Sequence, residues 1–313
     1  MADPSPFAHR PVLVDEVVEV FADVGNGVVV DATLGGGGHA AALAASQPGR
    51  TIIGIDRDPA ALEAAAARFA ADPELSGRLS TWRGRFDEVL ADLGVDEPVL
   101  GVLLDLGVSS PQLDRTERGF SYRVDAPLDM RMDPDAPRSA ADILADTDEA
   151  DLARILWNFG DERFARRIAR GIVAARPVTT TGQLVDIVRA AIPAPARRRG
   201  GHPAKRTFQA LRIAVNDELD ALETGLEAAL AATSPGGRVA AISYHSGEDR
   251  IVKRAFRNAV SGGCVCPPGL PCVCGAEPSA RNRTRGGITP TPSEIEANPR
   301  AASARLRAVE VIA

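Results

Sequence analysis

The stretch that decides the fold is Val-Val-Val-Asp-Ala-Thr-Leu-Gly-Gly-Gly-Gly-His-Ala, at residues 28–40. Three valines that end in an acid are typical of a short strand buried inside a parallel sheet. The glycines then open a helix, where backbone N–H groups are free and a ligand can approach the main chain. The run fits the pattern G-x-G-x-x-A of dinucleotide-binding turns, although such a turn also suits other nucleotides or a purely structural role.

The sequence around this stretch alternates between two kinds of segment. Buried apolar runs predict further strands at 51–56, 79–83 and 99–104. Helical segments are expected between them, at 39–46, 58–70 and 86–93. This rhythm predicts an α/β fold, with a parallel sheet and helices on both of its faces.

The alternation stops after residue 114, and only helical segments follow, at 148–158, 161–175, 181–191 and 205–230. A strand pattern resumes at 238–243, and 305–312 is expected to be a final edge strand. We therefore expect a helical domain at 114–208, inserted into a sheet domain formed by residues 1–113 and 209–313.

Three acids close predicted strands: Asp31, Asp56 and Asp105. Asp56 follows Gly38 by 18 residues, where a carboxylate can accept hydrogen bonds from the hydroxyls of an adenosine ribose. NAD and S-adenosylmethionine both carry that ribose. A carboxylate at Asp105 suits a cationic sulfonium and amino group better than a pyrophosphate, so we favour S-adenosylmethionine. Each acid taken alone could equally be a cap or a turn residue.

The net charge is −6, yet residues 161–212 hold 12 Lys or Arg against 3 Asp or Glu. Smaller basic clusters follow at 250–257 and 281–285. Any one cluster is most simply a solvated helix face, but together they favour a polyanionic partner. The sequence has no run near the ~20 apolar residues of a membrane span and no apolar signal core at residues 1–10. We therefore expect a cytoplasmic protein without a membrane partner.

Longer motifs run through most of the chain. They are HRPVL at 9–13, DATLGGGGH at 31–39, GIDRDP at 54–59, LLDLGVSSPQLD at 103–114, RGFS at 118–121, PLDMRMDP at 127–134, HPAKRTFQALRI at 202–213, SYHSGEDR at 243–250 and NPR at 298–300. On these motifs the sequence resembles the ribosomal RNA small subunit methyltransferase H family of bacteria, which are cytosine-N4 enzymes.

The resemblance implies a class I, Rossmann-like domain that depends on S-adenosylmethionine and carries a helical insertion. It also implies methyl transfer to the N4 amine of a cytidine in 16S rRNA near the decoding centre, with the small ribosomal subunit as partner and a homodimer as an open option. Carried over by motif, the cofactor contacts are Gly37, Gly38, His39, Asp56, Phe86, Asp105 and Gln112, with Phe86 against the adenine. The chain departs from the family at Gly247, where a Leu is usual.

The chemistry itself asks for hydrogen-bond acceptors near the transferred methyl group, because the lone pair of a cytosine amine is delocalised into the ring. We expect Asp105, Ser109 and Ser110 to supply them, with Asp129 and Asp133 as alternatives. No covalent adduct between enzyme and base is expected. Phe120, Tyr122 and Tyr244 could stack on bases, although an aromatic side chain is more often part of a core.

Four cysteines form the array C-x-C-x5-C-x-C, at Cys264, Cys266, Cys272 and Cys274. Structural zinc sites usually have C-x2-C spacing, so we expect no metal here, with zinc as the alternative. Two other functions remain open for the whole chain. One is a non-catalytic ribosome assembly factor that keeps the cofactor fold, and the other is an NAD-dependent oxidoreductase built on the same glycine run.

Overall fold

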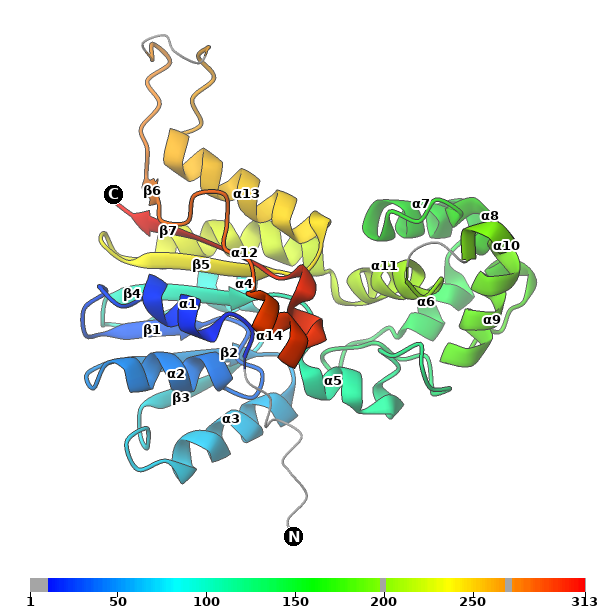
Figure 1. The fold of residues 1–313 in the computed structure, drawn as a ribbon, viewed down its shortest axis with the longest axis horizontal. Coiled ribbons are helices and arrows are strands. Elements are labelled where there is room, and N and C mark those ends of the chain that lie inside the picture. Colours follow the sequence, from blue (N-terminus) through cyan, green and yellow to red (C-terminus); the bar gives the residue numbers. More distant parts are fainter. Residues whose placement is uncertain (1–10, 198–200, 268–271, 313) are drawn as a thin grey trace. The chain divides into compact units, whose positions relative to one another are not determined.

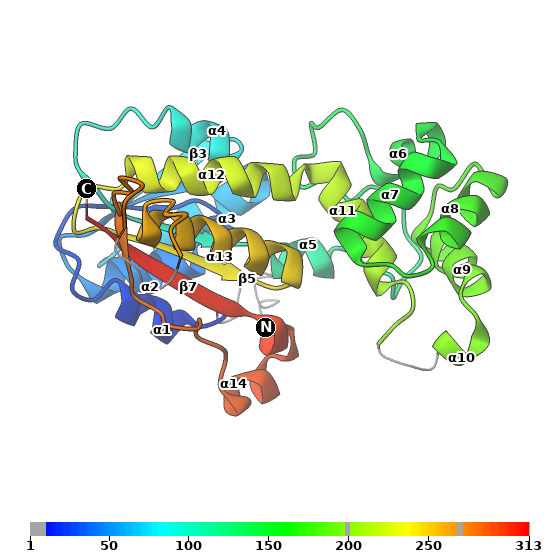
Figure 2. The ribbon, with the colours of Figure 1, turned by 90° about the horizontal axis from the view of Figure 1, so that it is seen from above.

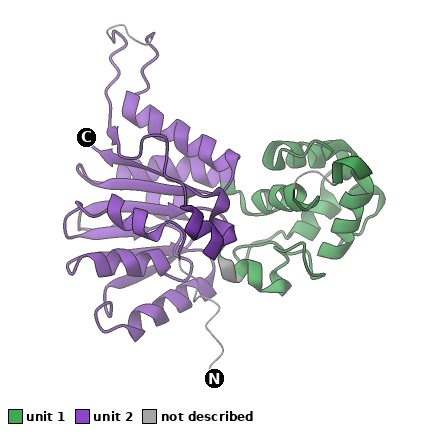
Figure 3. Cartoon of the chain, viewed as in Figure 1, with its two compact units in different colours: residues 1–6, 108–218 green, residues 7–107, 219–313 purple. Residues whose placement is uncertain are grey.

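The computed structural model describes residues 11–197, 201–267 and 272–312. By internal contacts, the described chain divides into two compact units (Figure 3). One consists of Val108–Glu218, and the other of the residues up to Gly107 together with those from Leu219 onward.

The larger unit is built on a seven-stranded sheet (Figure 1). Its strands are β1 (Val28–Asp31), β2 (Thr51–Asp56), β3 (Leu79–Arg83), β4 (Val99–Asp105), β5 (Arg238–Ser243), β6 (Ala280–Asn282) and β7 (Arg305–Val311). Their spatial order is β3-β2-β1-β4-β5-β7-β6. Strands β1 to β5 run parallel, while β7 runs antiparallel to both β5 and β6.

Helices cover both faces of this sheet (Figures 1 and 2). On one face pack α1 (Val14–Val20), α2 (Gly38–Ser46) and α3 (Pro59–Ala71), and on the other α4 (Phe86–Ala91), α12 (Glu218–Ala232) and α13 (Ser246–Ser261). Val29 contributes to the first core, whereas Val28 and Val30 contribute to the second. The continuous apolar run of β1 therefore reflects burial on both sides.

Strand β7 corrects one expectation. It lies between β5 and β6 and is not the edge of the sheet. Leu306 faces one core and Val309 the other, while the guanidinium of Arg307 donates to Asp249 of α13 at 2.7 Å. Burial on both faces explains why the apolar residues of this strand do not alternate strictly with polar ones. The true edge is β6, a three-residue strand inside a segment that the sequence pattern marked as irregular.

The smaller unit is helical and has a core of its own. Its helices are α5 (Ser110–Asp114), α6 (Ala140–Asp146), α7 (Glu149–Gly160), α8 (Ala165–Ala174), α9 (Thr181–Ala191), α10 (Ala194–Arg197) and α11 (Lys205–Asn216). The expected single helix at 205–230 is two helices, α11 and α12, because Asp217 between them adopts a left-handed conformation with φ 50°.

Polar side chains fix the ends and loops of this helical unit. Ser139 and Thr180 each close a capping box at the start of α6 and α9. Buried Asn216 accepts a hydrogen bond from the Met132 N–H at 2.7 Å and donates to the Met130 carbonyl at 2.8 Å. The loop 127–134 is therefore anchored to the end of α11. No helix of the described chain has both the length and the apolar character of a membrane span.

Candidate active site

The glycine turn connects β1 to α2 at the carboxyl edge of the sheet. Gly35 and Gly37 have positive φ, 49° and 70°, which glycine adopts without strain. A Cβ on Gly37 would lie 2.9 Å from the Ala65 Cβ, and a Cβ on Gly38 would lie 2.5 Å from the Pro11 Cγ. These two glycines are thus required by close packing of the protein itself. Gly37 is also the N-cap of α2, without a side chain to cover the free N–H groups.

Asp56 links the end of β2 to the glycine turn. Its carboxylate accepts hydrogen bonds from the backbone N–H groups of Gly35 and Asp58, both at 2.9 Å. Desolvation by burial raises the pKa of Asp56 despite these donors. The side chain is held in one orientation and keeps lone pairs for a further donor, as a ribose hydroxyl would require.

Asp105 ends β4 and is contacted from three directions. The Tyr244 hydroxyl donates to Oδ1 at 2.8 Å, the Nδ1 of His39 lies 3.5 Å from Oδ2, and the backbone N–H donates to the Thr33 hydroxyl at 2.6 Å. His39 Nε2 lies 2.9 Å from the Val12 carbonyl. A carbonyl can only accept, so Nε2 carries a proton and the ring is fixed with Nδ1 toward Asp105.

Tyr244 is the residue at this site whose role the sequence analysis missed, since it was considered only as a base-stacking side chain. It follows β5, and β5 is the parallel neighbour of β4. Carboxyl ends of adjacent parallel strands meet at one edge, so its position after the strand was a usable signal. Burial and the neighbouring Asp105 carboxylate raise the pKa of Tyr244 well above its usual value, which keeps the hydroxyl protonated as a donor.

Burial raises the pKa values of all three strand-end acids. For Asp31 desolvation is the largest cause and the pKa rises to about 7, with nearby Asp105 adding to the effect and His39 opposing it. Desolvation likewise raises the pKa of Asp105, against the influence of His39 and Tyr244. Carboxylates gathered in poorly solvated positions favour a bound cation, because a positive charge offsets their desolvation and mutual repulsion.

Phe86 begins α4 and is buried in the core. A Cβ on Gly225 of α12 would lie 2.2 Å from its ring, so the ring packs closely against that helix. Its expected contact with adenine stays a prediction.

The remaining predicted residues belong to the helical unit. Buried Gln112 accepts a hydrogen bond from the Ser109 N–H at 3.0 Å, which fixes the start of α5. The side chain of Ser110 lies outside the described residues. Asp129 binds the guanidinium of Arg131 through both carboxylate oxygens. Burial raises the pKa of Asp129, but the hydrogen bonds and charge of Arg131 outweigh it and hold this pKa below its usual value.

Outside the acid cluster, two histidines and two aromatic side chains make capping and packing contacts. His245 caps α13, since its Nδ1 accepts the N–H groups of Gly247 and Glu248 at 3.2 and 3.4 Å. The ring of Tyr122 stacks on His202 with centroids 4.4 Å apart. Phe120 is buried in the core of the helical unit.

The order of the strands, with β7 reversed between β5 and β6, defines a class I, Rossmann-like methyltransferase sheet. A dinucleotide-binding sheet of the same family of folds continues in the order 3-2-1-4-5-6, so the topology argues against the NAD alternative. The glycine turn and the strand-end acids lie at the edge where open α/β sheets bind their ligands.

Comparison with known proteins agrees with this class. The sequence model described as the MraW methylase family matches residues 6–312, and the chain belongs to that family. It is 52% identical to the ribosomal RNA small subunit methyltransferase H of Heliobacterium modesticaldum, over 98% of this chain and 99% of that protein.

A protein of the same name from Geobacter sulfurreducens is 54% identical over 97% of this chain and 99% of its own length. One from Mycobacterium sp. (strain KMS) is 55% identical over 97% of this chain and 84% of its own length. A solved rRNA methylase from Streptococcus thermophilus is similar with a TM-score of 0.43 and 12% identity, covering 96% of this chain and 94% of that one; so low a similarity carries no argument.

Proposed function

We propose that this chain transfers a methyl group from S-adenosylmethionine to the N4 amine of a cytidine in 16S rRNA, near the decoding centre of the small ribosomal subunit. The observation that carries the proposal is the set of strand-end acids Asp31, Asp56 and Asp105 beside a glycine turn, in a chain of the MraW methylase family. The names of the relatives support the small-subunit rRNA as substrate.

The residues present fit this cofactor. Asp56 is oriented by two backbone donors and can accept from a ribose. Asp105 and Asp31 lie at the ends of adjacent strands and have raised pKa values from burial, which a cationic ligand would relieve. When bound, the cofactor supplies an electrophilic methyl group on a sulfonium. We propose Gly37, Gly38, His39, Asp56, Phe86 and Asp105 as its contacts in the sheet unit.

The chain's own contribution to the reaction is to position the amine and accept its hydrogen bonds. We propose Asp105 as an acceptor, held by Tyr244 and oriented beside His39. Ser109 and Ser110 as acceptors and Gln112 as a cofactor contact stay proposals, drawn from the motif that directly follows β4. Positioning an acceptor before the reaction lowers the barrier because no reorganisation is needed as charge develops.

The substrate is a polyanion, and the helical unit supplies positive charge for it. Three exposed arginines lie on α8 or just before it, at Arg163, Arg166 and Arg167. No acidic partner is recorded for them in the described chain. Such side chains would contact phosphates and give binding that weakens with salt. A base paired within a helix would also have to be exposed before its amine could react.

Methyl transfer and binding tests separate this function from its alternatives. We expect calorimetry to detect S-adenosylmethionine but not NAD, and labelled methyl to reach small-subunit particles that lack the modification. Mass spectrometry of the rRNA should place the label on a cytosine amine. A chain that bound the particles and the cofactor but transferred no methyl group would act as the assembly factor instead.

The matched variants are Asp105→Asn and Glu63→Gln. Asp105→Asn removes the charge of the acid at the site, and we expect methyl transfer to fall by about 100-fold or more, in the range of a lost electrostatic contact. Glu63 is an exposed acid on α3, and its variant should retain full activity. Full transfer by Asp105→Asn would show that the site is assigned wrongly. Analytical ultracentrifugation of the same proteins would show whether the chain is a monomer or a homodimer.

A further inference from the structure

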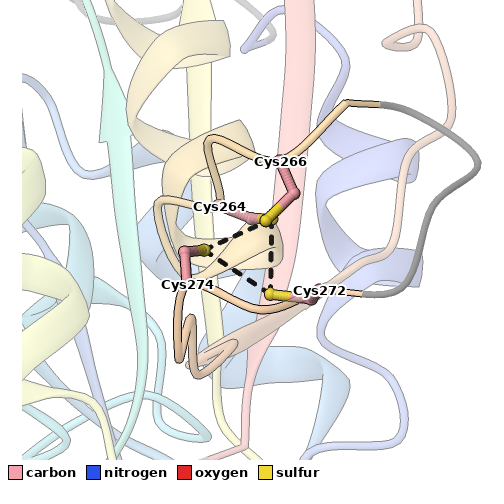
Figure 4. Close-up of side chains that lie close together, drawn as sticks. All are labelled: Cys264, Cys266, Cys272 and Cys274. Carbon is pink, nitrogen blue, oxygen red and sulfur yellow. Dashed lines mark hydrogen bonds between the residues drawn. The ribbon is translucent and has the colours of Figure 1, made fainter.

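The segment between α13 and β6 brings four thiols together (Figure 4). Cys264 and Cys266 lie on the arm that leaves α13, and Cys272 and Cys274 on the arm that leads to β6. Their Sγ atoms all lie within 4.8 Å of one another. The sulfur atoms of the two arms thus converge on a single point.

The distances between these sulfur atoms are informative. Cys264 and Cys272 are 3.6 Å apart, Cys272 and Cys274 3.5 Å, and Cys274 and Cys264 3.7 Å. A disulfide bond is about 2.05 Å long. Four sulfurs bound tetrahedrally at the usual Zn–S length of about 2.3 Å would be about 3.8 Å apart. These three distances therefore match a zinc tetrathiolate and not paired disulfides, and the Cys266 Sγ lies within 4.8 Å of the other three.

The backbone also supports the sulfurs in the way a metal site does. The N–H of Val273 donates to the Sγ of Cys266 at 3.4 Å. Hydrogen bonds of this kind orient the ligands of a metal and stabilise the charge on them. The donor comes from the opposite arm of the segment, so the same contact fixes the two arms against each other.

Packing does not explain the cluster. Free cysteines are usually among the most buried residues, but Cys272 and Cys274 are exposed. Val265 and Val273, which alternate with the cysteines, are 85% and 88% exposed. The hydrophobic cores of the described chain include no residue of these arms. The arms thus lack the apolar contacts that would otherwise hold them together.

We propose that Cys264, Cys266, Cys272 and Cys274 bind one Zn²⁺ as a tetrahedral tetrathiolate. All four positions around the ion are filled by protein, so the site is structural and leaves no position for a water or a substrate. The ion holds the two arms between α13 and β6 together. The C-x-C spacing, which by itself disfavours zinc, places both sulfurs of each arm on the same side, toward the other pair (Figure 4).

The first test uses the full chain purified under reducing conditions. We expect one equivalent of zinc by elemental analysis. Replacement by Co²⁺ should give the strong visible absorption and the thiolate charge-transfer bands of tetrahedral cobalt bound to sulfur. Absence of zinc together with absence of the cobalt spectrum after reconstitution would overturn the proposal. Stoichiometric iron would overturn the choice of zinc, since iron also accepts four thiolates.

The second test compares two variants of the same segment. The double variant C264S/C274S should lose the bound equivalent and the cobalt spectrum. Val273→Ser, at an exposed position between two ligands, should retain both. If the double variant still bound one equivalent, the ion would lie elsewhere. Emission of Trp82 in β3, measured in a Trp157→Phe background, shows whether the sheet unit of each variant is folded. The cobalt titration of the native chain does not depend on any variant.

Discussion

Asp31 lies at the buried end of β1, where burial raises its pKa to about 7. The unfolded chain has an ordinary aspartate pKa of about 3.9, so the folded protein binds this proton more tightly. Between about pH 4 and pH 7 the free energy of unfolding contributed by this group therefore falls as the pH rises. Above pH 7 the ionised acid therefore lowers the stability of the fold, which a bound cation would offset.

Replacing Asp31 by Asn should thus stabilise the sheet unit at pH 8 by about 1–3 kcal/mol, because the buried charge is removed. At pH 4 the native side chain is protonated, and the variant should unfold like the native chain. Urea unfolding in a Trp157→Phe background measures this, since Trp82 is then the only tryptophan. An equal effect at both pH values would contradict the assigned pKa.

Tyr244→Phe removes the only side-chain hydroxyl that donates to the Asp105 carboxylate among the recorded contacts of the described chain. A hydrogen bond to a charged group contributes about 1.5–3 kcal/mol, so we expect S-adenosylmethionine to bind about tenfold more weakly by calorimetry. The shape of the ring is kept. Tyr122→Phe, in the helical unit, serves as the control and should bind the cofactor normally.

At the scale of elements, the turn between β1 and α2 depends on Gly37. In Gly37→Ala the new side chain would sit on a left-handed backbone, φ 70°, and its Cβ would lie 2.9 Å from the Ala65 Cβ. We expect this variant to lose about 2–3 kcal/mol of stability. Gly77→Ala meets a similar φ of 78° with no atom within 4 Å, so it should cost only about 1 kcal/mol. Urea unfolding followed by the emission of Trp82 in the Trp157→Phe background gives both values. Equal losses would mean that packing at Gly37 is unimportant.

The loop 127–134 depends on one amide side chain. Asn216→Ala leaves the buried Met132 N–H and Met130 carbonyl without their recorded partner, which costs about 2–4 kcal/mol for two such groups. We expect the Met132 amide to exchange its hydrogen faster. Asn158→Ala, on the exposed side of α7, is the control. Unchanged exchange at Met132 would show that the loop is held by other contacts.

The elements that the sequence predicted well are those whose signal is local. The run at β1, the helix starts near residues 58 and 148, and the strand-end acids each depend on residues close in sequence. Strand β6 was missed because three residues carry no periodicity, and its pairing with β7 joins residues far apart in the chain. The break at Asp217 was missed because a single left-handed residue leaves the helical pattern on both sides intact.

For the candidate site, the sequence indicated the residues at the strand ends but not the contacts between their side chains. The acids and glycines could be read from strand ends, and the topology places them at one edge. The contacts of Asp105 with Tyr244 and His39 could not be read, because they depend on the register of separate strands and on side-chain orientation. The close approach of the four thiols could not be predicted from their spacing either, since the distance between the arms is a property of the folded loop.

For the whole molecule, charge is distributed unequally although the total is −6. We expect binding to the small-subunit rRNA to weaken steeply with salt, with a slope set by the number of phosphates contacted. Replacing Arg163, Arg166 and Arg167 by Gln should lower that slope by up to about three. The same positions replaced by Lys keep the charge and should keep the slope. A filter-binding series over salt concentration measures both, and an unchanged slope for the Gln variant would exclude this helix as a phosphate contact.

The two neighbours β4 and β5 are separated in the chain by the whole helical unit. During synthesis, β1 to β4 therefore leave the ribosome long before the strands that complete their sheet. The helical unit has its own core and can form in this interval, while the open side of β4 waits for β5 and then for β7. We expect nascent chains that end before residue 238 to have a folded helical unit beside an incomplete, aggregation-prone sheet. The insertion of the helical unit between β4 and β5 thus determines the order in which the two units can fold.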